Sequence, residues 1–236
     1  MQRCCQAGNN SRDEKETQMP VEKRAINEKD KLKRKDKILR TAWDLFEQND
    51  GRFPTVSVIA RVSGLSKGSI YLYFKTKSEI FLNLYIHQIK AWHLSVEKKL
   101  KKAGDQISIE EYAALTAEYL VKKPLLLTLG SMVAGELEKN ADKAVILELK
   151  MELARVLSRR SQMTARLFPG LEIKEWMNIH LRIYALIFGL WQMYYSSPQI
   201  HQVLGDKETG LFESDFYKSA RDSVTVFLKG ALNPDA

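Results

Sequence analysis

Cysteine, proline and glycine are scarce in this sequence, and each shortage excludes a class of structure. Among 236 residues there are only two cysteines, Cys4 and Cys5, which are adjacent in a polar segment. Two adjacent cysteines cannot cross-link a domain or supply the four ligands of a structural zinc site. We therefore expect no structural disulfide and no metal site, and we expect the protein to be cytoplasmic, where thiols stay reduced.

Six prolines and 12 glycines are too few to form the turns between a series of short strands. Apolar residues recur instead at helical spacing, which predicts an all-α fold. Long apolar runs are also missing. In the longest uncharged stretch, residues 183–205, only Ile183 to Trp191 is consistently apolar, which is too short to cross a bilayer. The first 30 residues likewise lack the apolar run of a signal peptide, so we expect no membrane association.

The net charge of +8 is concentrated in one part of the chain. Residues 1–30 carry six basic and six acidic groups, whereas residues 31–90 carry 12 basic and 5 acidic groups, a net charge of +7. Residues 91–236 carry 19 basic and 18 acidic groups, a net charge of +1. A run of basic residues is most often a solvated surface. Its coincidence with the helical motif described next favours contact with nucleic-acid phosphate.

The stretch from Thr55 to Phe81 predicts two short helices and the start of a long one. Thr55 can cap the first helix, and Ser63-Gly64 ends it, because glycine adopts the left-handed C-cap conformation without steric cost. Ser66 can cap the second helix, which we predict from Lys67 to about Phe74. A helix this short is marginal by itself. Its free side carries small, hydroxyl and cationic groups, which is typical of a helix that enters the DNA major groove.

Residues 64–74, GLSKGSIYLYF, followed by KTKSE at 75–79, closely resemble the DNA-binding signature of TetR-type transcriptional regulators. The resemblance covers residues 35–85, and it is specific because it fixes small, aromatic and basic residues at set offsets. It implies an N-terminal three-helix helix-turn-helix DNA-binding domain and a C-terminal helical ligand-binding and dimerisation domain. We accordingly expect a disordered polar tail at residues 1–30, a DNA-binding domain at 31–80 and an effector-binding and dimerisation domain at 81–236.

Within the DNA-binding domain, we expect some residues to position the protein on phosphate and others to lie near base edges. Lys77, at the positive N-terminal end of the long helix, is expected to bind phosphate. Tyr71 and Tyr73 can contact the sugar-phosphate backbone, although both could instead be core aromatics. Few long polar side chains face the groove, so DNA shape is expected to carry much of the specificity. The expected DNA-binding residues are Thr55, Ser57, Ser66, Lys67, Gly68, Ser69, Tyr71, Tyr73 and Lys77.

The remaining sequence predicts a series of longer helices. Thr76 and Ser108 each begin a capping-box pattern, with glutamate three residues later. The helix from Glu172 is apolar nearly all round, so it must be buried on more than one side, against the core and against a second copy of the chain. The resemblance implies that it pairs with the last helix, after a loop through Pro198 and Gly210, in a four-helix bundle between subunits. The approximate predicted helices are 31–49, 76–102, 108–121, 125–139, 142–168, 172–195 and 215–229.

The C-terminal part contains no glycine-rich phosphate loop and no catalytic or metal-binding spacing, so we expect neither a cofactor nor an enzyme. Polar and aromatic groups scattered through apolar helices are instead typical of a small-molecule pocket, although most such aromatics are core residues. The family resemblance implies an effector without naming it. The candidate effector-binding residues are Trp92, Met132, Glu136, Trp176, His180, Tyr184, Phe188 and Trp191.

Taken with the resemblance, these features predict a homodimeric regulator of a palindromic DNA operator, and a repressor that a small apolar or amphipathic molecule releases. Two alternatives remain open. One is a ligand-independent DNA-binding protein of the same fold, such as a nucleoid or division factor, with a filled C-terminal core. The other is a helical enzyme in which Glu136, His180 or Tyr184 acts as acid or base, which requires these groups to converge in one cleft.

Overall fold

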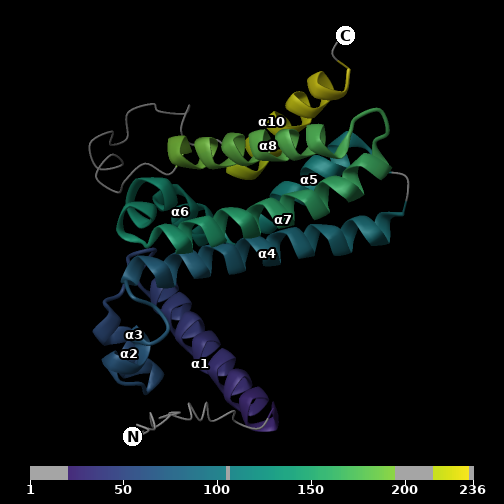
Figure 1. Ribbon diagram of the computed structural model, residues 1–236. Helices are drawn as coiled ribbons and strands as arrows, with labels where there is room; N and C mark the ends of the chain where they lie inside the picture. Colours follow the sequence, from purple (N-terminus) through teal and green to yellow (C-terminus); the bar gives the residue numbers. More distant parts are fainter. Residues whose placement is uncertain (1–20, 105–106, 195–214, 234–236) are drawn as a thin grey trace, which may run out of the picture. The chain divides into compact units, whose positions relative to one another are not determined.

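The computed structural model describes residues 21–104, 107–194 and 215–233, and within this part of the chain every regular element is helical (Figure 1). The predicted all-α fold is therefore confirmed. None of the described helices is both long and apolar enough to cross a membrane. The elements are α1 (Val21–Gln48), α2 (Val56–Ser63), α3 (Lys67–Tyr71), α4 (Lys77–Ala103), α5 (Ile109–Val121), α6 (Pro124–Met132), η1 (Val133–Leu137), η2 (Glu138–Asn140), α7 (Lys143–Leu167), α8 (Ile173–Tyr194) and α10 (Phe216–Leu232).

The first helix begins ten residues earlier than predicted. The expected start at Lys31 is wrong, because α1 is helical from Val21. Residues 21–30 have no apolar stripe, but they are rich in Glu, Lys, Arg and Ala, which favour helix, and extending an existing helix is easier than starting one. An ion pair between Asp30 and Lys33, at 3.7 Å, adds a local contact. The rest of the predicted tail, residues 1–20, lies outside the described residues.

The chain divides into two compact units after Lys37, and the second unit contains all the other helices. At its N-terminal end, Ile38, Ala42 and Phe46 of α1 are buried, as their helical spacing predicts. Their core is aromatic: the Phe53 ring centroid lies 5.5 Å from that of Phe46 and 4.4 Å from that of Phe81. Because Phe81 belongs to α4, this long helix is held directly against the helix-turn-helix.

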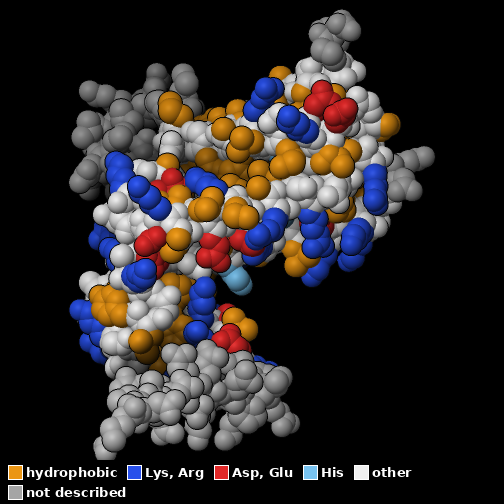
Figure 2. Space-filling model, viewed as in Figure 1, with side chains coloured by type: hydrophobic (Ala, Val, Ile, Leu, Met, Phe, Trp, Pro, Cys, Tyr) orange, Lys and Arg blue, Asp and Glu red, His pale blue; other side chains and the backbone are white. Residues whose placement is uncertain are grey.

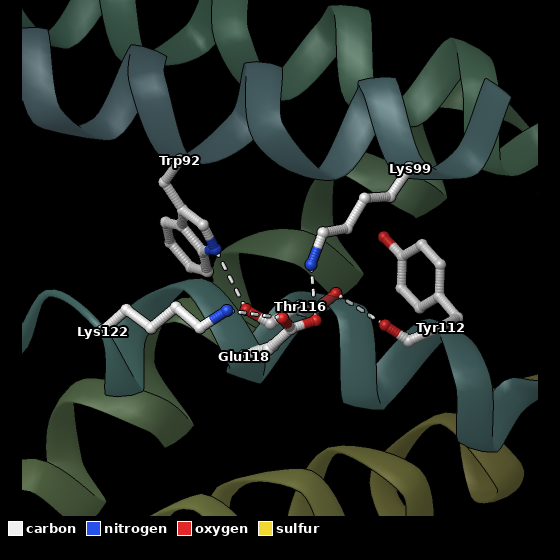
Figure 3. Close-up of polar contacts among 6 residues, drawn as sticks. All are labelled: Trp92, Lys99, Tyr112, Thr116, Glu118 and Lys122. Atoms are coloured by element: carbon white, nitrogen blue, oxygen red, sulfur yellow. Dashed lines mark hydrogen bonds and ion pairs between the residues drawn. The ribbon is translucent and has the colours of Figure 1, made fainter. Parts of the chain in front are cut away.

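Farther along, α4 packs against α5 and α7, and α7 packs in turn against α8 (Figure 1). The last helix, α10, lies against both α5 and α8. Trp92 on α4 donates a hydrogen bond from its indole nitrogen to the Thr116 carbonyl of α5 at 3.0 Å, and Lys99 and Lys122 both form ion pairs with Glu118 (Figure 3). The two helices are thus joined by a buried contact and by a more exposed one.

Two details differ from the predicted helix boundaries. Helix α3 is shorter than expected, ending at Tyr71 rather than Phe74. The helix predicted at residues 125–139 is α-helical only to Met132, then becomes the π-helix η1 and the 3₁₀-helix η2. Pro124 occupies the first turn of α6, where its missing N–H costs nothing. The loop predicted through Pro198 and Gly210 lies outside the described residues.

Candidate nucleic-acid interface and effector core

The helix-turn-helix is fixed by side-chain caps at both of its short helices. Thr55 Oγ1 accepts from the Val58 amide at 3.3 Å, and Ser66 Oγ accepts from the Ser69 amide at 3.0 Å. Both predicted caps are therefore confirmed. Gly64 ends α2 at a φ of 66°, in the left-handed region that its lack of Cβ permits. Since each capping oxygen accepts from the backbone, the Thr55 hydroxyl proton remains free for an acceptor outside the helix.

Most of the predicted DNA-binding residues lie in α3 or in the turns directly before and after it. Ile70 and Phe74 are buried, and the Lys67 ammonium lies 5.9 Å from the centre of the Tyr71 ring. Tyr71 is 44% exposed, so it is not a core aromatic, whereas Tyr73 is half-buried. Of the nine residues, six are exposed, namely Thr55, Ser57, Ser66, Lys67, Gly68 and Tyr71. The other three are half-buried, namely Ser69, Tyr73 and Lys77.

Sequence reasoning did not single out one exposed apolar residue beside α3. Leu72, which follows α3 directly, is 83% exposed, although an exposed leucine gains nothing in water. The signal was present, since Leu72 falls outside the four-residue spacing of buried Ile70 and Phe74.

Lys77 begins α4, and its ammonium lies 5.3 Å from the centre of the Phe53 ring. The capping box predicted at Thr76 is only half correct. Thr76 Oγ1 accepts from the Glu79 amide at 3.2 Å, but Glu79 Oε2 accepts from the Lys75 amide at 2.7 Å rather than from Thr76. This bond reaches one residue farther back and so fixes the turn between α3 and α4. A lysine held at the positive end of a 27-residue helix is a suitable phosphate ligand.

The predicted effector-binding residues are not all brought together. Trp92, Tyr184 and Phe188 form one aromatic group, with the Tyr184 ring 5.3 Å from Trp92 and stacked 4.8 Å from Phe188. His180 and Trp176 lie one and two turns before Tyr184 on α8, and their rings are 5.6 Å apart. All of these except half-buried Phe188 are buried.

The other three candidates lie apart from this group. Trp191 is buried against Phe216 of α10, with ring centroids 5.2 Å apart. Met132 is half-buried at the end of α6, and Glu136 is exposed on η1. Among the described residues, no hydrogen bond links the exposed Glu136 carboxylate to buried His180 or Tyr184.

A buried polar network beside the aromatic group was not anticipated. Arg160 of α7 is 2% exposed, and it donates from Nε to Tyr112 Oη at 3.0 Å and from Nη2 to Thr116 Oγ1 at 3.1 Å. Tyr112 Oη also lies 2.8 Å from His180 Nε2, and His180 Nδ1 lies 2.9 Å from Ser161 Oγ. The only advance signal was the spacing of Arg160 between the buried positions Leu157 and Thr164.

Burial and the Arg160 charge both oppose protonation of the two histidines in this region. Desolvation, followed by the nearby guanidinium, lowers the pKa of His93 to about 3, and the same causes hold the pKa of His180 well below its ordinary value. Burial likewise raises the pKa of Tyr85 to about 12 and raises that of Tyr112. Both histidines are therefore neutral at pH 7, and Arg160 is the charged group of the network.

Stability should fall as the solution is made acidic. Because the folded-state pKa of each histidine lies below its unfolded value of about 6.5, the unfolded chain binds the extra protons, and stability is full above pH 6.5 and lost below it. His93 should remove about 1.4 kcal/mol from the free energy of unfolding between pH 7.5 and pH 5.5, and His180 should contribute a loss of the same sign. Urea denaturation at the two pH values, at one protein concentration, measures this loss.

The His93→Leu variant should lose the part of this acid sensitivity that His93 contributes, about 1.4 kcal/mol, whereas a variant at exposed His87, His87→Gln, should keep all of it. An unchanged acid sensitivity in His93→Leu would show that His93 is not held neutral by the fold.

Comparison with known proteins agrees with this geometry. Residues 38–84 match the family model for bacterial regulatory proteins of the tetR family, and residues 87–235 match the tetracyclin repressor-like C-terminal domain. The HTH-type transcriptional regulator QacR of Staphylococcus aureus is 34% identical over 88 residues, 36% of this chain and 47% of QacR, so the match spans about half of that relative. The regulator AcrR of Shigella flexneri is 25% identical over 200 residues, 81% of this chain and 86% of AcrR.

Among solved structures, the TetR-family regulator PfmR from Thermus thermophilus aligns with a TM-score of 0.49 at 18% identity, covering 81% of this chain and 97% of PfmR. The two family models together extend from the first buried residue of α1 to the end of the described chain, and the C-terminal model alone covers more than half of the sequence. The chain belongs to the TetR family of helix-turn-helix transcriptional regulators.

Proposed function

We propose that this regulator is a repressor, that it binds a palindromic operator as a homodimer, and that a small apolar or amphipathic molecule releases it. The observation that supports the proposal best is the continuity of α4. The N-terminal end of this helix carries Lys77 and packs Phe81 into the helix-turn-helix core, and its middle carries Trp92 into the aromatic group. A change in that group can therefore reach the DNA-binding surface through a single rigid element.

On DNA, the exposed surface of α3 is proposed to enter the major groove. Lys67 and Ser69 lie at the start of α3, where base edges come within reach, and Gly68 allows close approach. Lys77, Tyr71 and Thr55 are proposed to bind sugar and phosphate and thereby set the register of the protein. In a dimer the two α3 helices must match half-sites about 34–36 Å apart, so a small shift of each α4 weakens binding.

For the homodimer, the support is an apolar surface that no described residue covers. Leu181 of α8 is 54% exposed and Val226 of α10 is 71% exposed. Between the two helices runs an open groove of about 710 Å³, and Figure 2 shows hydrophobic side chains gathered around α8. A twofold partner would bury this surface against its own copy. The groove is lined by Arg182, Ala185, Leu186, Asp222, Ser223, Val226 and Phe227.

The direct test is binding of the purified protein to DNA from its own promoter region, with and without a panel of apolar and amphipathic compounds. We expect specific binding that one class of compound reverses, and a scrambled duplex of the same composition serves as the control. Specific binding that no compound disturbs would contradict ligand release and favour the ligand-independent alternative. Binding to the promoter no tighter than to the scrambled duplex would contradict local repression.

A further inference from the structure

Arg160 is a buried cation with no negative partner among the described residues. Its hydrogen-bond acceptors are the hydroxyls of Tyr112 and Thr116, and its guanidinium lies 5.0 Å from the centre of the Tyr112 ring. The preceding residue, Arg159, is different, since it is exposed to solvent and pairs with Glu97 at 2.9 Å. Burying a charge without a counter-charge is costly, and proteins usually pair such a group.

The directions of the hydrogen bonds show that the residues bonded to Arg160, directly or through one another, are all neutral. Arg160 can only donate to Tyr112 Oη, so the Tyr112 proton is directed to His180 Nε2. His180 is then protonated at Nδ1, and it donates to Ser161 Oγ, whose own proton goes to the Leu157 carbonyl at 2.8 Å. Every member is neutral except Arg160, so the network carries a net charge of about +1.

Two further buried polar side chains near this network have unpaired nitrogen atoms. Neither ring nitrogen of His93 is hydrogen-bonded although the side chain is 7% exposed, and the indole N–H of fully buried Trp176, one turn before His180, is also unpaired. His93 lies on α4 beside Trp92, with ring centroids 5.2 Å apart, and the Arg160 charge acts on it. The region therefore contains unpaired N–H donors and the charge of Arg160, and the buried carboxylate of Glu97, one turn after His93 on α4, is already paired with Arg159.

We infer that Arg160 and His93 receive the anionic group of the effector, and that the effector is an amphipathic carboxylate whose apolar body packs against Trp92, Tyr184 and Phe188. This inference rests on the proposed release by a ligand and adds the chemical class of that ligand. A carboxylate supplies two acceptor oxygens and the missing charge, and arginine binds such a group with fixed geometry.

The position of the site also explains how its occupation could reach DNA. Arg160 is on α7, its hydrogen-bond partners Tyr112 and Thr116 are on α5 (Figure 3), and His93 is on α4. An anion bound by Arg160 and His93 draws α7 and α4 toward a common centre. From His180 to Phe188, α8 extends about 12 Å, which sets the scale of the apolar body.

The test uses matched pairs that differ only in charge, decanoate with methyl decanoate and 4-phenylbutyrate with its methyl ester. Direct binding is measured by tryptophan fluorescence, and release by displacement from promoter DNA. We expect at least one acid to bind at least 30-fold more tightly than its ester and to release the DNA. Equal action of acid and ester would overturn the anionic site and leave ligand release intact. Binding of an acid without release would support the site and contradict the proposed release, and binding of no acid would overturn the site.

A second comparison uses variants on α7. Arg160→Gln should weaken binding of the acid at least 30-fold and leave binding of the ester unchanged, whereas Arg160→Lys should retain part of the preference for the acid. The control, Arg166→Gln, replaces an exposed arginine of the same helix and should bind as the unmodified protein does. If Arg160 only stabilised the fold, Arg160→Gln would weaken acid and ester equally, or fail to fold, while the unmodified protein showed no preference for the acid.

Discussion

Substituting alanine for Lys77 is expected to weaken operator binding on the order of 100-fold. A hydrogen bond to a charged group contributes about 1.5 kcal/mol, and a dimer loses two of them. Because each lost phosphate contact also ends the release of a counterion, the slope of log K against log salt should become shallower by about 1.8. Fluorescence anisotropy with promoter DNA at several salt concentrations gives both quantities.

Lys98→Ala is the matched control, since Lys98 is an exposed lysine farther along the same helix. It should leave both the affinity and the salt slope unchanged. The loss in Lys77→Ala should be equal for specific and scrambled duplexes, because a phosphate contact carries no sequence information. An unaltered salt slope in Lys77→Ala would mean that this lysine faces only solvent and the Phe53 ring.

Adding one methyl group at Gly130 is expected to destabilise the protein by about 1–3 kcal/mol. A Cβ at this position of α6 would lie 1.9 Å from Phe188 Cε1, so the ring must leave its stacked position on Tyr184. Alanine otherwise favours helix over glycine by about 1 kcal/mol, so a loss of stability would have to come from this contact. Urea denaturation of Gly130→Ala measures the change in the free energy of unfolding.

Two further variants isolate the contact. In a Phe188→Ala background the Gly130 substitution should become neutral or stabilising, because the obstructing ring is gone. Gly135→Ala, five residues along on η1, adds a methyl group with no atom within 4 Å and should not destabilise. Gly130→Ala as stable as the unmodified protein would show that α6 can move away from α8 without cost.

Local features were predictable from local sequence. Thr55, Ser66 and Ser108 were predicted as helix caps from their spacing alone, and all three accept the expected amide hydrogen bonds. A cap depends on three or four consecutive residues, so it can be predicted from the local sequence alone. The start of α1 was missed for a related reason, since apolar periodicity was required of residues that are helical through their own propensity.

The polar network could not be predicted, because it depends on contacts between distant residues. Arg160 bonds to Tyr112 and Thr116, which lie 48 and 44 positions earlier, and His180 meets Tyr112 across 68 positions. Helical spacing could place each of these residues on an inward face, but not opposite one another. The same limit applies to the effector candidates. Trp191 and Glu136 are an aromatic and a polar residue of the kinds expected in a pocket, but both lie apart from the aromatic group.

The unbroken length of α4 has a thermodynamic consequence. If one helix carries the coupling between the effector core and the DNA-binding surface, the interaction between the two sites must be reciprocal. Operator DNA would then lower the affinity of the protein for its effector by the same factor by which the effector lowers the affinity for DNA. The effector concentration that half-saturates the protein would therefore be higher on the operator than in free solution. The number of operators in the cell would then change the effector concentration at which DNA is released.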